Sequence, residues 1–126
     1  MSEISGTDRQ ILGRFGEDQA VDYLTLKGYR ILKRNFRCRL GEIDIIASKE
    51  NTLVFAEVKL RKDGRYGTPA EFVNATKQRK LILTAEYYMA FAEADLQPRF
   101  DIIEIYAPYG KNDRVTINHI ENAFGC

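Results

Sequence analysis

The sequence predicts a single α/β domain over residues 1–126, with one mixed five-stranded sheet and helices packed against it. A length of 126 residues is that of one domain. Helical and strand-like patterns follow one another in the order helix, three strands, helix, two strands, and no repeat or linker interrupts them. The chain is 44% hydrophobic and 29% charged, which is typical of a globular protein and not of a disordered one.

The first helix is predicted from a capping box, Thr7-Asp8-Arg9-Gln10, in which Thr7 is the N-cap and Gln10 follows three residues later. Residues 1–6 are expected to form a flexible tail. The helix should run to about residue 27 and end at Gly28, because glycine readily adopts the left-handed conformation that closes many helices. Its apolar positions approximate one helical stripe: Leu12, Phe15, Ala20, Val21 and Leu24.

Three strands should follow, over residues 29–36, 42–48 and 52–60, where β-branched, aromatic and aliphatic residues are frequent. The connections between them are short, with Arg39-Leu40-Gly41 before the second strand and Lys49-Glu50-Asn51 before the third. Strands joined in this way pair antiparallel, so the three segments predict an antiparallel meander.

A second helix should begin at Thr68, with Pro69 at its first position and Glu71 closing a capping box. It is expected to extend to about residue 94. The residues that should face the core recur at helical spacing: Leu81, Ala85, Tyr88 and Ala92. Strands over residues 99–106 and 115–120 complete the predicted sheet.

Composition argues against several classes of protein. No apolar run approaches the ~20 residues of a membrane-spanning helix, and the N-terminus lacks the basic start and apolar core of a signal peptide. A cytoplasmic location is therefore expected. Two cysteines and a single histidine match no zinc module and do not favour a nucleophilic Cys–His site. If the protein is an enzyme, carboxylates and lysines are expected to carry the chemistry.

Basic residues are segregated along the chain although the net charge is only +1. They form three groups: Lys27, Arg30, Lys33, Arg34, Arg37 and Arg39; Lys59, Arg61, Lys62 and Arg65; and Lys77, Arg79 and Lys80. A neutral protein with such segregation can present a basic face to a polyanion. The same residues can equally form solvated loops and helix faces, and the charge pattern alone leaves both interpretations open.

Charged residues inside apolar strand segments are the strongest functional signal. Asp44 lies among isoleucines, and Glu57 and Lys59 alternate with apolar residues, so these two project from one face of their strand. Antiparallel pairing can bring Asp44 beside Glu57, and two adjacent carboxylates repel unless a cation lies between them. The pattern predicts a Mg²⁺ or Mn²⁺ site formed by Asp44, Glu57 and the backbone carbonyl of Val58. Lys59 would hold the attacking water and offset charge on a phosphate oxygen.

The alternative is a structural ion pair of Lys59 with Glu57 or Asp44 at a sheet edge. Burying three charges without a function is unfavourable, which favours the metal site. Glu17 is a further candidate, because it shares a helical face with apolar positions three, four and seven residues later. Glu17 can reach the metal site, directly or through water, or pair with a basic residue at the rim of the helix. The spacing leaves both open.

These residues resemble known motifs. Asp44 followed by Glu57-Val58-Lys59 resembles the Asp…Glu-x-Lys signature of the PD-(D/E)XK, or restriction-endonuclease-like, nucleases, with Ile43 where the name of that superfamily has proline. A wider pattern over residues 13–124 resembles the YraN-like family of small bacterial proteins. That pattern includes Gly16-Glu17, Tyr23-Leu24, Gly28-Tyr29, Arg34-Asn35, residues 41–47, Tyr66-Gly67, Lys77 and Arg99-Phe100-Asp101.

The resemblance implies a restriction-endonuclease-like core. Similarity to archaeal Holliday junction resolvases implies that Glu17 joins Asp44, Glu57 and Lys59 in a catalytic site for Mg²⁺-dependent hydrolysis of nucleic acid, DNA rather than RNA, with branched or structured DNA as a candidate substrate. Expected contacts to the phosphate backbone are Lys33, Arg34, Arg37, Arg39, Arg61, Arg65 and Lys77. The alternatives are a non-catalytic nucleic-acid-binding protein of the same fold and a protein-interaction module with a basic face. A homodimer is compatible with each of these functions.

Overall fold

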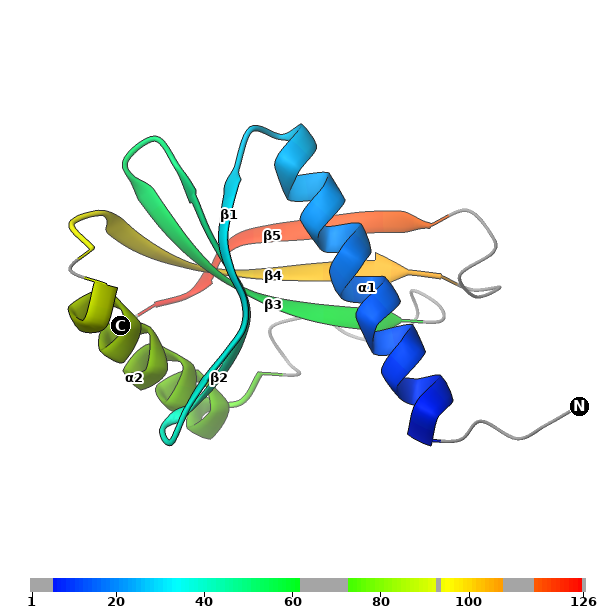
Figure 1. The fold of residues 1–126 in the computed structure, drawn as a ribbon, viewed down its shortest axis with the longest axis horizontal. Helices are drawn as coiled ribbons and strands as arrows, with labels where there is room; N and C mark the ends of the chain where they lie inside the picture. Colours follow the sequence, from blue (N-terminus) through cyan, green and yellow to red (C-terminus); the bar gives the residue numbers. More distant parts are fainter. Residues whose placement is uncertain (1–5, 62–72, 93, 108–114, 126) are drawn as a thin grey trace, which may run out of the picture.

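The structure is a computed structural model that describes residues 6–61, 73–92, 94–107 and 115–125, with the backbone alone over residues 6–12. Figure 1 shows its elements: α1 (Gly6–Leu26), β1 (Arg30–Cys38), β2 (Gly41–Lys49), β3 (Thr52–Arg61), α2 (Ala75–Ala92), β4 (Gln97–Tyr106) and β5 (Thr116–Phe124). The α/β class and the order of the elements are those predicted. Neither described helix is long and apolar enough to cross a membrane.

The five strands form one mixed sheet in the order β1-β2-β3-β4-β5. β1, β2 and β3 pair antiparallel, which confirms the predicted meander. β4 pairs parallel with β3, because the intervening segment with α2 carries the chain back to the starting end of β3. β5 then pairs antiparallel with β4. β3 is therefore the central strand, and β1 and β5 are the edges.

The first helix ends as the sequence predicts. Gly28 has a φ of 93°, in the left-handed region, and the backbone N–H of Tyr29 donates to the carbonyl of Leu24 at 2.9 Å. The helix begins at Gly6, so this residue is helical and not part of a tail. The rest of the expected tail and the side chains of the expected capping box lie outside the described residues.

The second helix begins later than predicted. Val73 and Asn74 are not helical, and α2 starts at Ala75. Asn74 is its N-cap, because the Oδ1 atom of Asn74 accepts a hydrogen bond from the backbone N–H of Lys77 at 2.9 Å. The prediction of one continuous helix from Thr68 is therefore wrong, because Val73 and Asn74 interrupt it. Residues 68–72 lie outside the described residues.

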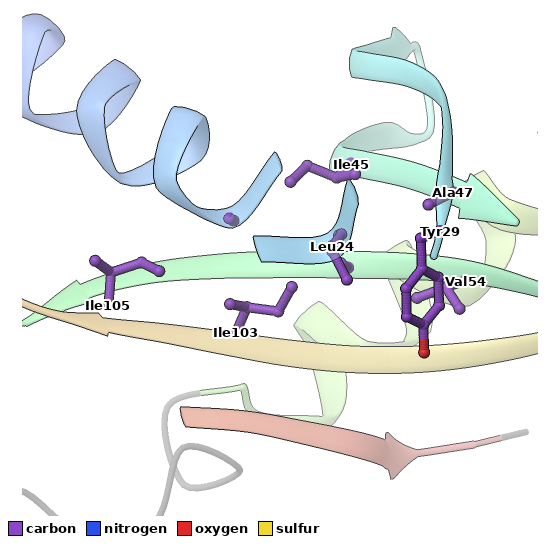
Figure 2. Close-up of a cluster of buried hydrophobic side chains, with 9 residues drawn as sticks. Leu24, Tyr29, Ile45, Ala47, Val54, Ile103 and Ile105 are labelled. Carbon is purple, nitrogen blue, oxygen red and sulfur yellow. The ribbon is translucent and has the colours of Figure 1, made fainter. Parts of the chain in front are cut away.

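Apolar side chains pack on both faces of the sheet. The cluster under α1 includes Leu24, Tyr29, Ile45, Ala47, Val54, Ile103 and Ile105 (Figure 2). The cluster under α2 includes Ile46, Leu53, Phe55, Leu81, Ala85, Phe100 and Ile102. Burial of Leu81 and Ala85 confirms the predicted core face of α2, whereas Ala92 is exposed in the last turn, contrary to expectation. Burial on both faces explains why residues 53–56 of β3 form an unbroken apolar run.

Candidate active site

The acidic pair lies on adjacent strands at the centre of the sheet. Ile45 pairs with Ala56, and one further step of that register places Asp44 opposite Glu57. Their carboxyl groups share a hydrogen bond, and the Oδ2 atom of Asp44 also accepts from the backbone N–H of Val58 at 2.8 Å. Glu57 is only 7% exposed, so the pair is largely removed from water.

Two lysine amines approach the same oxygen of Glu57. The Nζ atom of Lys77 lies 2.5 Å from Oε2 of Glu57, and that of Lys59 lies 3.8 Å from it. Lys59 is there because side chains two residues apart on β3 share a face. Lys77 comes from the first turn of α2, which its contact with Asn74 holds in place. The structure thus brings Asp44, Glu57 and Lys59 together and adds Lys77 to them.

The ionisation of the cluster reflects its burial. Burial raises the pKa of Asp44 to about 8, and the charge of Glu57 adds to this effect. Burial acts to raise the pKa of Glu57 too, but hydrogen bonds from Asp44 and Lys77 outweigh it and hold that pKa below its ordinary value. Burial also lowers the pKa of Lys59. Near neutral pH the two carboxyl groups therefore share one proton, an arrangement that is frequent in functional sites.

Glu17 on α1 lies near this cluster. Its Oε1 atom accepts from the Nδ2 atom of Asn35 at 2.9 Å and pairs with the Nη2 atom of Arg34 at 3.2 Å. Arg34 is shared with Asp18, which it meets at 2.6 Å. The charge of Glu17 also contributes to the raised pKa of Asp44. Glu17 is thus paired at the rim of its helix and close enough to influence the acidic pair.

Asn35, named above only as part of the family pattern, is a further residue of the site. It has a φ of 53° within β1, and the register of β1 with β2 places it opposite Asp44. This left-handed conformation is costly for most side chains, is tolerated by asparagine, and clusters at functional sites. The available signal was an asparagine inside a segment otherwise typical of a strand, where asparagine is disfavoured.

A further buried carboxylate, Glu104, lies beside Lys59 on the neighbouring strand. Its Oε1 atom accepts hydrogen bonds from the hydroxyl of Tyr106 at 2.6 Å and from Asn118 at 3.1 Å. Its Oε2 atom lies 3.6 Å from the Nε atom of Arg61, whose side chain is 17% exposed. Arg61, expected to contact phosphate, is therefore mostly buried against Glu104 in this structure.

Four of the other expected phosphate contacts lie at one edge of the sheet. Lys33, Arg34 and Arg37 are exposed on β1, and Arg39 is exposed in the turn that follows. Arg37 pairs with Glu42 at 2.9 Å. Arg65 lies outside the described residues.

The sequence matches an uncharacterised protein family, UPF0102, over residues 16–105. The chain belongs to UPF0102. A UPF0102 protein of Caldicellulosiruptor bescii is 50% identical over 115 residues, which cover 90% of this chain and 96% of that protein. Another, from Thermodesulfovibrio yellowstonii, is 49% identical over 113 residues, covering 90% and 95% of the two chains. This confirms the resemblance to the YraN-like family, and the matched span contains the whole acidic cluster.

Asp44 and Glu57 are the oxygen donors that this candidate site brings together. Among the residues that the structure describes, no three carboxylate, imidazole or thiol groups gather closely enough to hold a metal by themselves. Mg²⁺ commonly takes only one or two protein carboxylates and completes its shell with water and substrate phosphate. Asp44 and Glu57 offer that number of oxygen ligands, and they lack the nitrogen and sulfur ligands that zinc prefers.

Proposed function

We propose that this protein is a metal-dependent nuclease that hydrolyses phosphodiester bonds in DNA. The observation that carries the proposal is the buried pair of Asp44 and Glu57, with two lysine amines on one oxygen of the pair. Apolar residues of similar volume would serve the core at least as well as these charges, so stability does not account for them. Their resemblance to the Asp…Glu-x-Lys signature supports the same chemistry.

Each side chain has a definite role in this proposal. Asp44 and Glu57, with the carbonyl of Val58, would hold Mg²⁺ or Mn²⁺. The bound ion would supply an activated water and neutralise charge on the phosphate. Lys59 would donate a hydrogen bond to that water and would offset the negative charge that develops on phosphate oxygens. Glu17 supports the site from α1 through Asn35.

Lys77 can both pair with Glu57 and contact a substrate phosphate. Its side chain is 42% exposed, so its amine is accessible to a substrate phosphate as well as to Glu57. A lysine so placed positions a phosphodiester without reading its sequence.

The test is cleavage of end-labelled single-stranded, duplex, flap and branched DNA in Mg²⁺ or Mn²⁺. Wild type should cleave at least one substrate, and Asp44→Asn and Glu57→Gln should lose cleavage by orders of magnitude. Asp22→Asn, which alters an exposed carboxylate of α1, is the matched control and should cleave normally. Equal cleavage by wild type and Asp44→Asn would refute the proposal. If the protein binds DNA without cleaving it, it is the non-catalytic nucleic-acid-binding protein. If it neither binds nor cleaves DNA, the result favours the protein-interaction module.

A further inference from the structure

A groove of aromatic and basic residues lies between β1 and α2, and we refer to it as the aromatic groove. Phe36, Arg37, Arg39, Leu40, Tyr87 and Phe91 line a cavity of about 550 Å³. An adjoining cavity of about 510 Å³ shares Phe36, Arg37 and Phe91 and adds Lys33 and Tyr88. Together the two cavities form a continuous surface along the exposed edge strand.

Aromatic rings on this surface are open to solvent. Phe91 is 74% exposed and Tyr87 is 48% exposed. The ring of Phe36 packs beside two of the tyrosines of α2, with its centroid 6.3 Å from that of Tyr87 and 5.2 Å from that of Tyr88. Exposed apolar surface gathered in a groove is typical of a place where a ligand or partner binds.

The charges around these rings indicate the chemistry of the occupant. Lys33, Arg37 and Arg39 surround them, and the described residues that line the two cavities include no carboxylate. Glu42 reaches Arg37 from outside the groove. Flat apolar rings among cations match an unpaired nucleotide strand, whose bases stack on aromatic side chains while its phosphates contact lysine and arginine. A duplex hides the faces of its bases and cannot use the rings.

A second copy of the chain is the main alternative occupant. A two-fold contact through the aromatic groove would place Lys33, Arg37 and Arg39 near their own counterparts, and such like-charge contacts are unfavourable. The charge pattern therefore favours a polyanion.

The aromatic groove adjoins the side of the candidate active site where Glu17 lies. Asn35 and Arg37 line both the second cavity and a polar cavity of about 580 Å³ that contains Glu17 and Arg34. Asn35 also lies opposite Asp44 in the register of the sheet. A nucleic-acid strand in the groove would therefore lie one β-strand away from Asp44, with Asn35 of β1 between them.

We propose that the aromatic groove binds single-stranded nucleic acid beside the bond that is cut. Unpaired bases stack on Tyr87 and Phe91, and Lys33, Arg37 and Arg39 contact the phosphates. This inference rests on the proposed function, because it specifies the form of nucleic acid that the nuclease takes.

The test measures binding with metal chelated, so that cleavage does not enter. Fluorescence anisotropy with a 20-nucleotide single strand, as DNA and as RNA, and with the matching DNA duplex gives the affinities of each variant. Tyr87→Ala and Phe91→Ala should each weaken single-strand binding about 5- to 150-fold, the range expected for the loss of one stacking contact. Duplex affinity should change less than about twofold, because stacking does not contribute to duplex binding.

Controls separate stacking from charge and from general damage. Leu83→Ala removes an exposed apolar side chain of the same helix outside the groove and should bind as wild type. Tyr87→Phe keeps the ring and should bind nearly normally. The slope of log affinity against log salt should be unchanged in the aromatic variants and about 0.7 shallower in Arg39→Ala. Comparison of the affinities for the DNA and RNA single strands shows whether the groove prefers deoxyribose or ribose.

The proposal is overturned if Tyr87→Ala and Phe91→Ala bind single strands as tightly as Leu83→Ala, or if they lose single-strand and duplex binding equally. A wild-type dimer that dissociates on Phe91→Ala while single-strand binding persists would identify a second copy as the occupant. Failure of the nuclease proposal gives a different result. A protein that binds single strands through Tyr87 and Phe91 but cleaves none would refute the nuclease activity and support the binding groove.

Discussion

Replacement of Asp44 by asparagine should stabilise the protein while abolishing its proposed activity. Asparagine has the shape of a protonated aspartate. Its oxygen can accept the hydrogen bond from the Val58 N–H, now 2.8 Å long, and its amide can donate to Glu57 in place of the shared proton. The substitution therefore removes only the ionisation of Asp44, which burial makes unfavourable.

The size of the effect follows from the pKa. Burial raises the pKa of Asp44 from 3.8 to about 8. Between these values the folded protein keeps a proton that the unfolded chain has released, so stability falls as pH rises through that window. At about 1.36 kcal/mol per pKa unit the difference is at most about 6 kcal/mol. The lowered pKa of Glu57 acts in the opposite sense because the two groups share one proton, so the expected net gain is about 1–3 kcal/mol at pH 9.

Thermal and urea unfolding between pH 4 and pH 9 measure this prediction. For a domain of this size, Asp44→Asn should melt about 3–10 °C above wild type at pH 9 and close to it at pH 4. Asp22→Asn is the control and should follow wild type throughout. Mn²⁺ should raise the melting temperature of wild type and not of Asp44→Asn, because a ligand stabilises only the protein that binds it. A variant less stable than wild type at pH 9 would show that the carboxylate serves the fold, and the reasoning would be wrong.

Three further outcomes are expected. Lys59→Met should keep the fold and metal binding but lose cleavage by orders of magnitude in single-turnover assays, whereas a destabilised yet fully active variant would contradict the role of Lys59. Burial opposes ionisation of Asp101, but hydrogen bonds from His119 and Arg99 dominate and lower its pKa. Its stabilisation is therefore present at neutral pH and lost as the pH falls through the lowered pKa, so Asp101→Asn should cost about 3 kcal/mol at pH 7 by urea unfolding, and the cost should shrink as the pH falls below the ordinary aspartate range. A Cβ at Gly41 would lie 2.8 Å from Oγ1 of Thr84, so Gly41→Ala should cost about 1–3 kcal/mol in chemical denaturation, and adding Thr84→Ala should recover part of it.

The part of the site that sequence could reveal depends on local geometry. Glu57 and Lys59 are two residues apart, and strand alternation alone puts them on one face. Asp44 reaches them because a short turn forces its strand to pair antiparallel with theirs. Asn35 and Lys77 were not assigned to the acidic cluster, since neither an αL residue inside a strand nor the landing point of a helix on a sheet follows from local pattern.

The sequence by itself determined the α/β class, the order of elements, the antiparallel meander and the acidic pair, because periodicity, turn residues and alternation act over a few positions. The tertiary structure decided the rest. Burial of apolar surface between distant segments set the parallel pairing of β3 with β4 and laid α2 on the sheet, where Lys77 meets Glu57. The same packing left Tyr87 and Phe91 exposed beside the cations of β1. Such contacts arise between residues far apart in the chain, so no local preference specifies them.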